Sequence, residues 1–199
     1  MTEKESPKII LSPLEPSDHE QFIKDLQESF KYGATEEFGM RDNHFDKEGQ
    51  IIPRRDVERT IKSGKSIIYR IILDNKKVGG IIFDIKKDKK TGELEFLFIS
   101  PNEHSKGIGT KTWFMIEEMY PEIELWITHT PYFEKRNIHF YMNRLGFHAV
   151  EFYNEKHKLH FEKENSEEEN QNEEENEEEE EEFFKGPEEF FKFEKRMKK

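Results

Sequence analysis

The chain has 199 residues, no cysteine and a formal net charge of -12. This length fits one substantial domain, and the lack of cysteine excludes disulfides, thiolate metal sites and cysteine nucleophiles. The N-terminus lacks a basic segment followed by an apolar one, and nowhere do 18 apolar residues run together. We therefore expect a cytoplasmic protein that makes no use of a membrane.

The acidity of the chain belongs to one segment. Residues 164–182 hold 13 glutamates and no lysine or arginine, which leaves 31 acidic residues (44 minus 13) against 32 basic ones elsewhere. Like charges repel and the segment has almost nothing apolar to bury, so we predict that residues 157–186 form a disordered, glutamate-rich insertion. It is either a solvated loop or a segment that captures basic proteins. The near-neutral remainder gives no reason to expect nucleic-acid binding.

The first third of the chain predicts a strand and two helices. "KIILSPL" reads as a strand, and residues 17–31 have an apolar stripe at helical spacing, with Ser17 and Glu20 placed as a capping box. "PRRDVERTIKSG" opens with proline and closes with glycine, as a second helix does. The long polar stretch 32–52 between them is expected to be functional.

The rest of the body alternates between strands and helices. Two β-rich runs meet at Asp74-Asn75, which predicts a hairpin. The later elements are a strand at 92–100, a helix after the glycines at 107 and 109, a strand in "IELWITHT", a helix ending at Gly146 and a strand in "FHAVEFYNE". Early hairpins followed by strand and helix alternation indicate a mixed sheet covered by helices.

The segment "EHSKGIGT" (103–110) joins a predicted strand to a predicted helix. Its glycine spacing fits neither a P-loop nor a dinucleotide fingerprint. Such a turn still exposes free backbone N–H groups at the positive end of a helix dipole, where an anion such as a pyrophosphate can bind. A glycine turn without any ligand fits the same pattern.

A second motif, "RNIHFYMNRLGF" (136–147), follows at a distance. Together with "ISPNEHSKGIGT", it resembles the GNAT superfamily of acyl-CoA-dependent N-acyltransferases, with its [QR]-x-x-G-x-[GA] loop and later FY-x-x-x-G-F pattern. The resemblance implies an α/β (α+β) fold with a mixed, mostly antiparallel sheet of about six to seven strands and about four helices. It also implies a single domain over 1–199 that ends in a strand at 187–197. The residues of this last segment fit a short helix equally well, and a homodimer is left open.

The resemblance implies acetyl-CoA as the cosubstrate, a primary amine as the acceptor, and no metal. In the family, a bulge late in the fourth strand, which corresponds to Phe98 and Ile99 here, offers backbone N–H groups to the thioester carbonyl. His104 stands where the family has glutamine or arginine and retains a donor for phosphate. Asn137 is the candidate to replace the family's asparagine, which is Glu134 here, although a solvent-facing amide is equally expected. The predicted cofactor-binding residues are Phe98, Ile99, His104, Lys106, Gly107, Ile108, Gly109, Thr110 and Asn137.

The predicted catalytic residues are two carboxylates and a phenol. Glu93 and Glu95 lie two apart on one strand face, so either can take the proton of the incoming ammonium, directly or through water. Glu93 holds the family's frequent base position and is the first choice. The resemblance assigns protonation of the departing thiolate to Tyr141. The alternatives are acids on a half-exposed strand and a tyrosine in the core.

Acceptor selection is expected to fall to the long loop and to a histidine at a strand end. His129 is a candidate, although isolated histidines are more often structural, and no spacing suggests a metal. The loop candidates are Phe38, Arg41 and His44. The alternative function is an inactive, acyl-CoA-binding interaction protein that uses its acidic tract to bind basic partners.

Overall fold

The computed structural model describes residues 8–35, 46–104, 106–132, 134–158 and 189–198. Its elements, in chain order, are β1 (Ile9–Pro13), α1 (His19–Thr35), α2 (Arg54–Ser63), β2 (Ile67–Leu73), β3 (Lys76–Ile85), β4 (Thr91–Ile99), α3 (Ile108–Met119), β5 (Leu125–Pro131), α4 (Lys135–His139), β6 (His148–Tyr153) and β7 (Phe190–Arg196). The 3-10 turns Pro16–Asp18 and Pro101–Glu103 precede α1 and follow β4, and a π-helix, Phe140–Leu145, continues α4.

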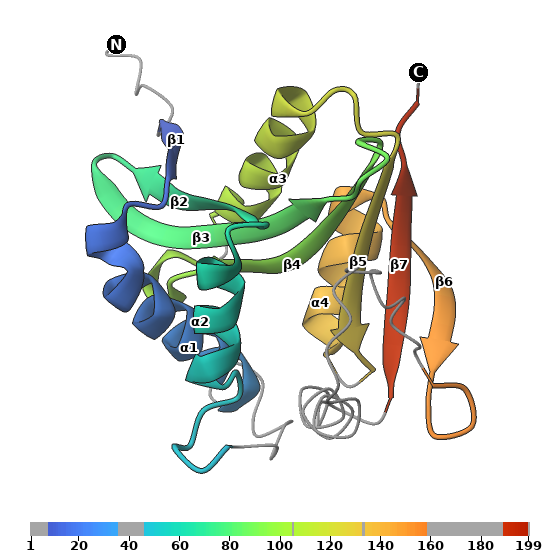
Figure 1. The fold of residues 1–199 in the computed structure, drawn as a ribbon, viewed down its shortest axis with the longest axis horizontal. Helices are drawn as coiled ribbons and strands as arrows, with labels where there is room; N and C mark the ends of the chain where they lie inside the picture. Colours follow the sequence, from blue (N-terminus) through green and yellow to red (C-terminus); the bar gives the residue numbers. More distant parts are fainter. Residues whose placement is uncertain (1–7, 36–45, 105, 133, 159–188, 199) are drawn as a thin grey trace, which may run out of the picture.

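The strands form one sheet in the order β1-β2-β3-β4-β5-β7-β6 (Figure 1). Every neighbouring pair is antiparallel except β4 and β5, which are parallel. The helices α1 and α2 lie on one face of the sheet, and α3 and α4 lie on the other. This arrangement confirms the mixed, mostly antiparallel sheet and the four helices expected from sequence.

The C-terminal segment adopts the strand alternative. β7 lies between β5 and β6 and pairs antiparallel with both, so a segment remote in sequence completes the middle of this half of the sheet. Residues 159–188, which include nearly all of the predicted glutamate-rich insertion, lie outside the described residues.

Local turn chemistry follows the sequence in most places. Asp74 and Asn75 have φ values of 48° and 65°, the left-handed pair of a tight hairpin turn. The helix α1 forms as expected, but the capping box does not, because a 3-10 turn occupies its start. The Glu20 carboxylate instead accepts hydrogen bonds from Arg54, with Nη1 at 2.9 Å, and so joins α1 to α2.

Two hydrophobic layers hold the sheet between its helices. The layer toward α3 and α4 contains both tryptophans, and Trp113 packs edge-on against Trp126 with ring centroids 5.0 Å apart. The layer toward α1 and α2 is smaller. Its buried members are Phe22, Ile23, Leu26, Val57, Ile82 and Phe98.

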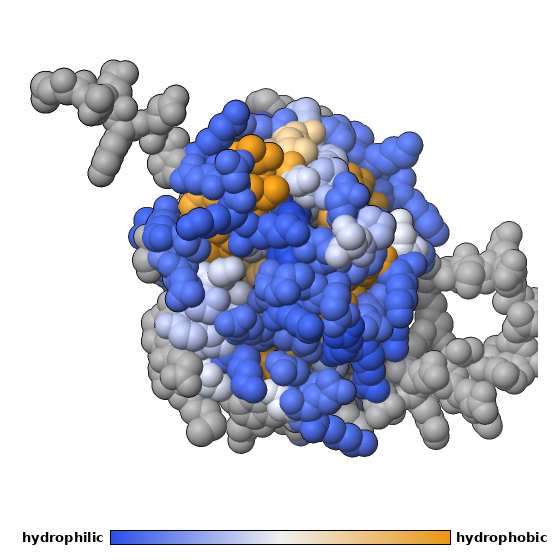
Figure 2. All heavy atoms as spheres, turned by 90° about the vertical axis from the view of Figure 1, so that its left-hand side faces the viewer, coloured by the Kyte–Doolittle hydropathy of each residue, from blue (hydrophilic) through white to orange (hydrophobic). Residues whose placement is uncertain are grey.

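The surface outside these layers is mainly polar. Figure 2 shows the side that carries α1 and β1, where hydrophilic side chains predominate and hydrophobic ones gather toward one end. None of the helices in the described part of the chain is both long and apolar enough to cross a bilayer.

Two glycines should respond oppositely to an added methyl group. A Cβ at Gly92 would overlap the buried Trp126 ring, whereas a Cβ at Gly33, inside α1, would have nothing within 4 Å. We expect Gly92→Ala to lower the free energy of unfolding by about 1–3 kcal/mol through overpacking. Gly33→Ala should raise it by about 0.5–1 kcal/mol through helix propensity. Denaturant unfolding of both variants measures this, and equal midpoints would contradict the packing of Trp126 on Gly92.

Candidate active site

The two parallel strands separate in the middle of the sheet. β4 pairs with β5 from Thr91 to Leu94, whose partners run from Leu125 to Thr128. Beyond Leu94, β4 continues beside β3 and β5 continues beside β7. Within the described sheet, the last part of β4 therefore has one edge without a strand partner. We call this unpaired edge of β4, from Glu95 to Ile99, the β4–β5 gap.

The ladder between β3 and β4 determines which backbone groups face this gap. Ser100 N–H donates to Val78 O at 2.7 Å, and residues two apart on a strand repeat the same direction. Phe98 therefore bonds to β3, whereas Leu97 and Ile99 direct their N–H and C=O groups toward the gap. This corrects the predicted donor pair, because the Phe98 amide is used by the sheet. It also adds Leu97, which the sequence analysis missed.

The bulge of β4 also lies earlier than expected. Ile82 pairs with Phe96 and Phe83 pairs with Leu94, so Glu95 is the extra residue. The alternation of side chains along one strand does not reveal a bulge, because a bulge is defined by the register with the partner strand. Its consequence is local, since it turns β4 at the residue where its pairing with β5 has just ended.

The glycine loop forms the helix N-terminus that its sequence predicts. Gly107 has φ 72°, and Lys111 N–H makes the first helical bond of α3, to Gly107 O at 3.0 Å. The N–H groups of Ile108, Gly109 and Thr110 precede that bond and so have no partner within the helix. A Cβ on Gly109 would lie 3.4 Å from Phe140 and 3.8 Å from Ile99, so the loop touches the second motif and the end of β4.

The side chains of two predicted cofactor-binding residues, Lys106 and His104, already have protein partners. Lys106 Nζ lies 2.6 Å from Glu103 Oε2 in a surface ion pair. His104 Nε2 lies 2.7 Å from Ile99 O, and the Ser29 hydroxyl donates to the same oxygen at 3.2 Å. The His104 ring also contacts Tyr32 of α1 edge-on, with ring centroids 5.7 Å apart. The His104 side chain therefore contacts the protein backbone at the gap.

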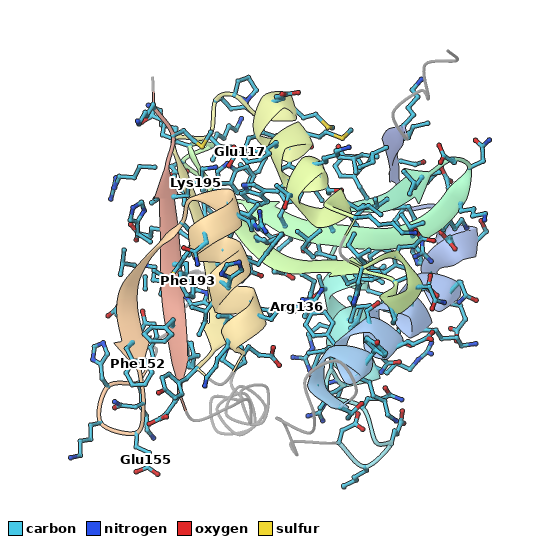
Figure 3. The ribbon with its side chains drawn as sticks, turned by 180° about the vertical axis from the view of Figure 1, so that it is seen from behind. Glu117, Arg136, Phe152, Glu155, Phe193 and Lys195 are labelled. Carbon is cyan, nitrogen blue, oxygen red and sulfur yellow. The ribbon has the colours of Figure 1, made fainter. Side chains whose placement is uncertain are left out.

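Tyr141 lies in the π-helix that continues α4, among the core residues on the α3 and α4 face. Its ring contacts Phe147 and Phe193 at centroid distances of 5.8 Å (Figure 3 labels Phe193 on β7). Burial raises the pKa of its phenol, while a hydrogen bond with the Thr128 side chain acts in the opposite direction. Thr128 is the last β5 residue paired with β4, so the phenol lies where the two strands separate.

Three carboxylates lie on the opposite face of the same region. Leu94 packs in the layer toward α3, so its neighbour Glu93 faces α1 and α2, and Asp84 is paired with Glu93 across β3 and β4. Lys86 Nζ lies 2.5 Å from Glu93 Oε2, and His129 Nδ1 lies 3.4 Å from Glu93 Oε1. The structure thus brings together Glu93, Glu95 and His129, three of the residues expected from sequence.

The surroundings of Glu93 and Glu95 shift the pKa values of the two carboxyl groups in opposite directions. Burial raises the pKa of Glu93, but hydrogen bonds from His129 and Lys86 outweigh it and lower the pKa to about 2. Burial, followed by repulsion from and a shared hydrogen bond with Asp84, raises the pKa of Glu95 to about 8. A base works best with a pKa near the working pH. Glu95 therefore replaces Glu93 as the better candidate base.

The remaining predictions for the site fall in different places. Asn137 lies in α4, partly exposed. Phe38, Arg41 and His44 lie outside the described residues. Among the residues that the structure describes, no three histidine, aspartate or glutamate side chains are grouped so as to hold a metal ion.

A surface hollow of about 470 Å³ lies away from this site. It is bordered by the end of β7 and by Glu117 of α3, where Lys195 pairs with Glu117 (both labelled in Figure 3). Of the two sequence motifs, Gly146 is the residue that lines this hollow. We base the candidate site on the β4–β5 gap, because the glycine loop, Tyr141 and the carboxylates converge there.

Comparison with known proteins agrees with this geometry. The model of the acetyltransferase (GNAT) family matches residues 21–147. The chain belongs to the GNAT acetyltransferase family. This membership makes it an acyltransferase by family, and the GNAT loop and tyrosine motifs are the segments that meet at the gap.

Individual relatives support the same assignment. The chain is 43% identical to the uncharacterized protein YrkN of Bacillus subtilis over 157 residues, which cover 79% of this chain and 82% of that one. Its fold is similar to an acetyltransferase from Thermus thermophilus, with TM-score 0.62, 13% identity and coverage of 96% and 97% of the two chains. The PaiA N-acetyltransferase of Thermoplasma acidophilum, solved in complex with coenzyme A, matches with TM-score 0.60, 14% identity and coverage of 96% and 99%.

The opposite pKa shifts predict opposite effects of pH on stability. Because the pKa of Glu95 in the folded state, about 8, exceeds its unfolded value, the native state loses stability as pH rises from about 4 through 8. Glu95→Gln should therefore become increasingly more stable than the parent between pH 5 and 9, by about 1–3 kcal/mol at the upper end. Urea unfolding across this range measures the difference.

Glu93→Gln is the matched control. The depressed pKa of Glu93 means that its stabilisation is complete above about pH 4.3 and is lost as pH falls toward 2. This variant should be less stable than the parent at pH 5, and the difference should shrink toward pH 9, because loss of the Glu93 charge also lowers the pKa of Glu95. A pH-independent difference for Glu95→Gln would show that Glu95 has an ordinary pKa.

Proposed function

We propose that the protein is an N-acetyltransferase that transfers the acetyl group of acetyl-CoA to a primary amine by direct attack in a ternary complex. The observation that carries this proposal is the arrangement at the β4–β5 gap. A phenol lies at the point of strand separation on one face, and a carboxylate with a pKa of about 8 lies beside it on the other. A proton donor and a proton acceptor thus lie on the two faces of the sheet at the β4–β5 gap.

The choice of base follows from the size of the two pKa shifts. An alkylammonium has a pKa of about 10.4, so moving its proton to Glu93, with a pKa of about 2, costs roughly 11 kcal/mol. Moving it to Glu95, with a pKa of about 8, costs roughly 3 kcal/mol. We assign Glu95 as the general base, with Asp84 sharing its proton. Glu93 orients His129 and Lys86.

The other steps use groups already described. The N–H groups of Ile108, Gly109 and Thr110 are the proposed donors for the pyrophosphate of acetyl-CoA. The N–H groups of Leu97 and Ile99 face the gap and can bind the thioester oxygen as negative charge develops on it. The new bond joins the amine nitrogen to the acetyl carbon, and the carbon–sulfur bond breaks. Tyr141 supplies the proton to the departing thiolate.

The environment of Glu95 also favours a cationic acceptor. Asp84, Glu93 and Glu95 are three carboxylates, and the ammonium group of Lys86 opposes their negative charge. An ammonium bound there supplies the missing charge and displaces the proton that Glu95 otherwise retains. We therefore propose that the amine arrives protonated and is deprotonated in place.

We expect release of free thiol when the protein is mixed with acetyl-CoA and a panel of primary amines. The rate constant kcat/KM should rise as pH increases through about 8, because Glu95 acts in its ionised form. Glu95→Gln should lower kcat/KM at pH 8 by about 100-fold or more, the usual contribution of a general base. A thiol-reactive dye follows the reaction.

Glu93→Gln is the isosteric control for this experiment and should lose less activity than Glu95→Gln. Equal losses would remove the distinction between the two carboxylates. If the protein binds acetyl-CoA but releases no thiol with any amine, the proposed acetyltransferase activity is wrong. The acyl-CoA-binding interaction protein is then the better-supported function.

Tyr141→Phe tests the proton donor separately. The variant retains the ring that packs against Phe147 and Phe193 and removes only the hydroxyl. We expect kcat to fall by about 10–100-fold with little change in the Kd of acetyl-CoA, because the proton is needed only as the thiolate leaves. Unchanged kcat would make Tyr141 a core residue without a chemical role.

A further inference from the structure

We propose that His104 is a positioning residue that holds the end of β4 through the Ile99 carbonyl and does not bind phosphate. The inference rests on the proposed function, because its consequence is the shape of the acetyl-CoA site. It differs from the expectation from sequence, where His104 was a phosphate donor in place of the family's glutamine or arginine.

The first step is the hydrogen bond itself. His104 Nε2 lies 2.7 Å from Ile99 O, and a carbonyl oxygen can only accept. The hydrogen must therefore be on Nε2, either in the neutral Nε2–H form or in the imidazolium. Because both forms have this donor, the bond does not require a charged imidazole.

The second step is the position of the acceptor. Ile99 is the last residue of β4, and its carbonyl faces the gap, where β5 no longer pairs with β4. The Ser29 hydroxyl of α1 donates to the same oxygen at 3.2 Å. His104 and Ser29 thus take the place that a neighbouring strand would otherwise occupy at this carbonyl.

The third step is what the bond fixes. The peptide unit between Ile99 and Ser100 is held at both ends, because its N–H donates to Val78 O at 2.7 Å. The chain then turns through Pro101–Glu103, and His104 N–H bonds back to Pro101 O at 3.3 Å. One imidazole therefore closes the turn onto the strand from which it started.

The turn connects directly to the proposed cofactor site. Ile99 lies beside Gly109 of the glycine loop, and its N–H is a proposed donor in the gap. If the Ile99 carbonyl loses this hydrogen bond, the end of β4 is no longer fixed. The N–H groups in the gap and those of the glycine loop then lose their fixed positions relative to each other. Cofactor binding should therefore depend on the donor at the Nε2 position and not on positive charge at residue 104.

The test compares two amides of different reach. Glutamine places an N–H donor close to the position of histidine Nε2, whereas asparagine places it near Nδ1. We expect the Kd of acetyl-CoA for His104→Asn to exceed that for His104→Gln by about three- to tenfold, the effect of one lost hydrogen bond. Calorimetry and the thermal unfolding temperature of the free protein measure both variants. The unfolding temperature of His104→Asn should be the lower one.

The same pair of substitutions at His148, an exposed residue of β6, provides the control and should give two indistinguishable proteins. A phosphate-binding imidazolium predicts a different result. In that case, Kd for the parent would rise between pH 5.5 and 8, as histidine loses its charge, and both amides at position 104 would weaken binding alike.

The outcomes separate this inference from the proposed function. If the parent binds acetyl-CoA and the two variants at position 104 bind it equally, the positioning role is wrong and the function stands. If the parent binds neither acetyl-CoA nor CoA, the function fails, and the positioning role in cofactor binding fails with it.

Discussion

The separation of β4 from β5 is the constraint on which the rest of the site depends. A sheet interior normally pairs every backbone N–H and C=O group, and leaving such groups unpaired and buried is costly. Here the pairing stops at Leu94 and Thr128, and the protein compensates at Ile99 with bonds from Ser29 and His104. The donors that remain along this edge, at Leu97 and Ile99, are therefore fixed in direction before any ligand arrives. Preorganised donors of this kind cost no reorganisation during the reaction.

The same separation explains the contrast between the two faces of the sheet. The face toward α3 and α4 is closed by aromatic packing, which holds Tyr141 protonated and largely out of water. On the face toward α1 and α2, Asp84, Glu93 and Glu95 lie close together, and Lys86 and His129 pair with Glu93. Burial acts on both glutamates, but the cationic partners lie on Glu93. The carboxylate that the lysine pairs with therefore has the lower pKa, and this difference is the ground for proposing Glu95 as the base.

The parts of this protein that are local in sequence could be predicted from it. The Asp74-Asn75 hairpin, the glycine at the start of α3 and the glycine that ends the Tyr141 helix need only their own backbone conformations. The mixed, mostly antiparallel sheet was expected from the family resemblance, which also favoured the C-terminal strand where periodicity had left two alternatives. The bulge at Glu95 and the partner of His104 could not be predicted, because each depends on a strand or carbonyl positioned by tertiary contacts.

A residue at a family motif position need not have the role that the family gives to that position, and two residues near the gap show why. Glu93 holds the expected base position, but Lys86, two residues beyond its strand partner Asp84, neutralises it. His104 holds the expected phosphate position, but the Ile99 carbonyl, five residues earlier, accepts its hydrogen bond. In both cases the nearest partner, a cation for the carboxylate and an acceptor for the imidazole N–H, determines what the side chain can do. The backbone donors at the start of α3 differ, because their direction is set by the helix itself, and they are the part of the site that the sequence motif predicted most directly.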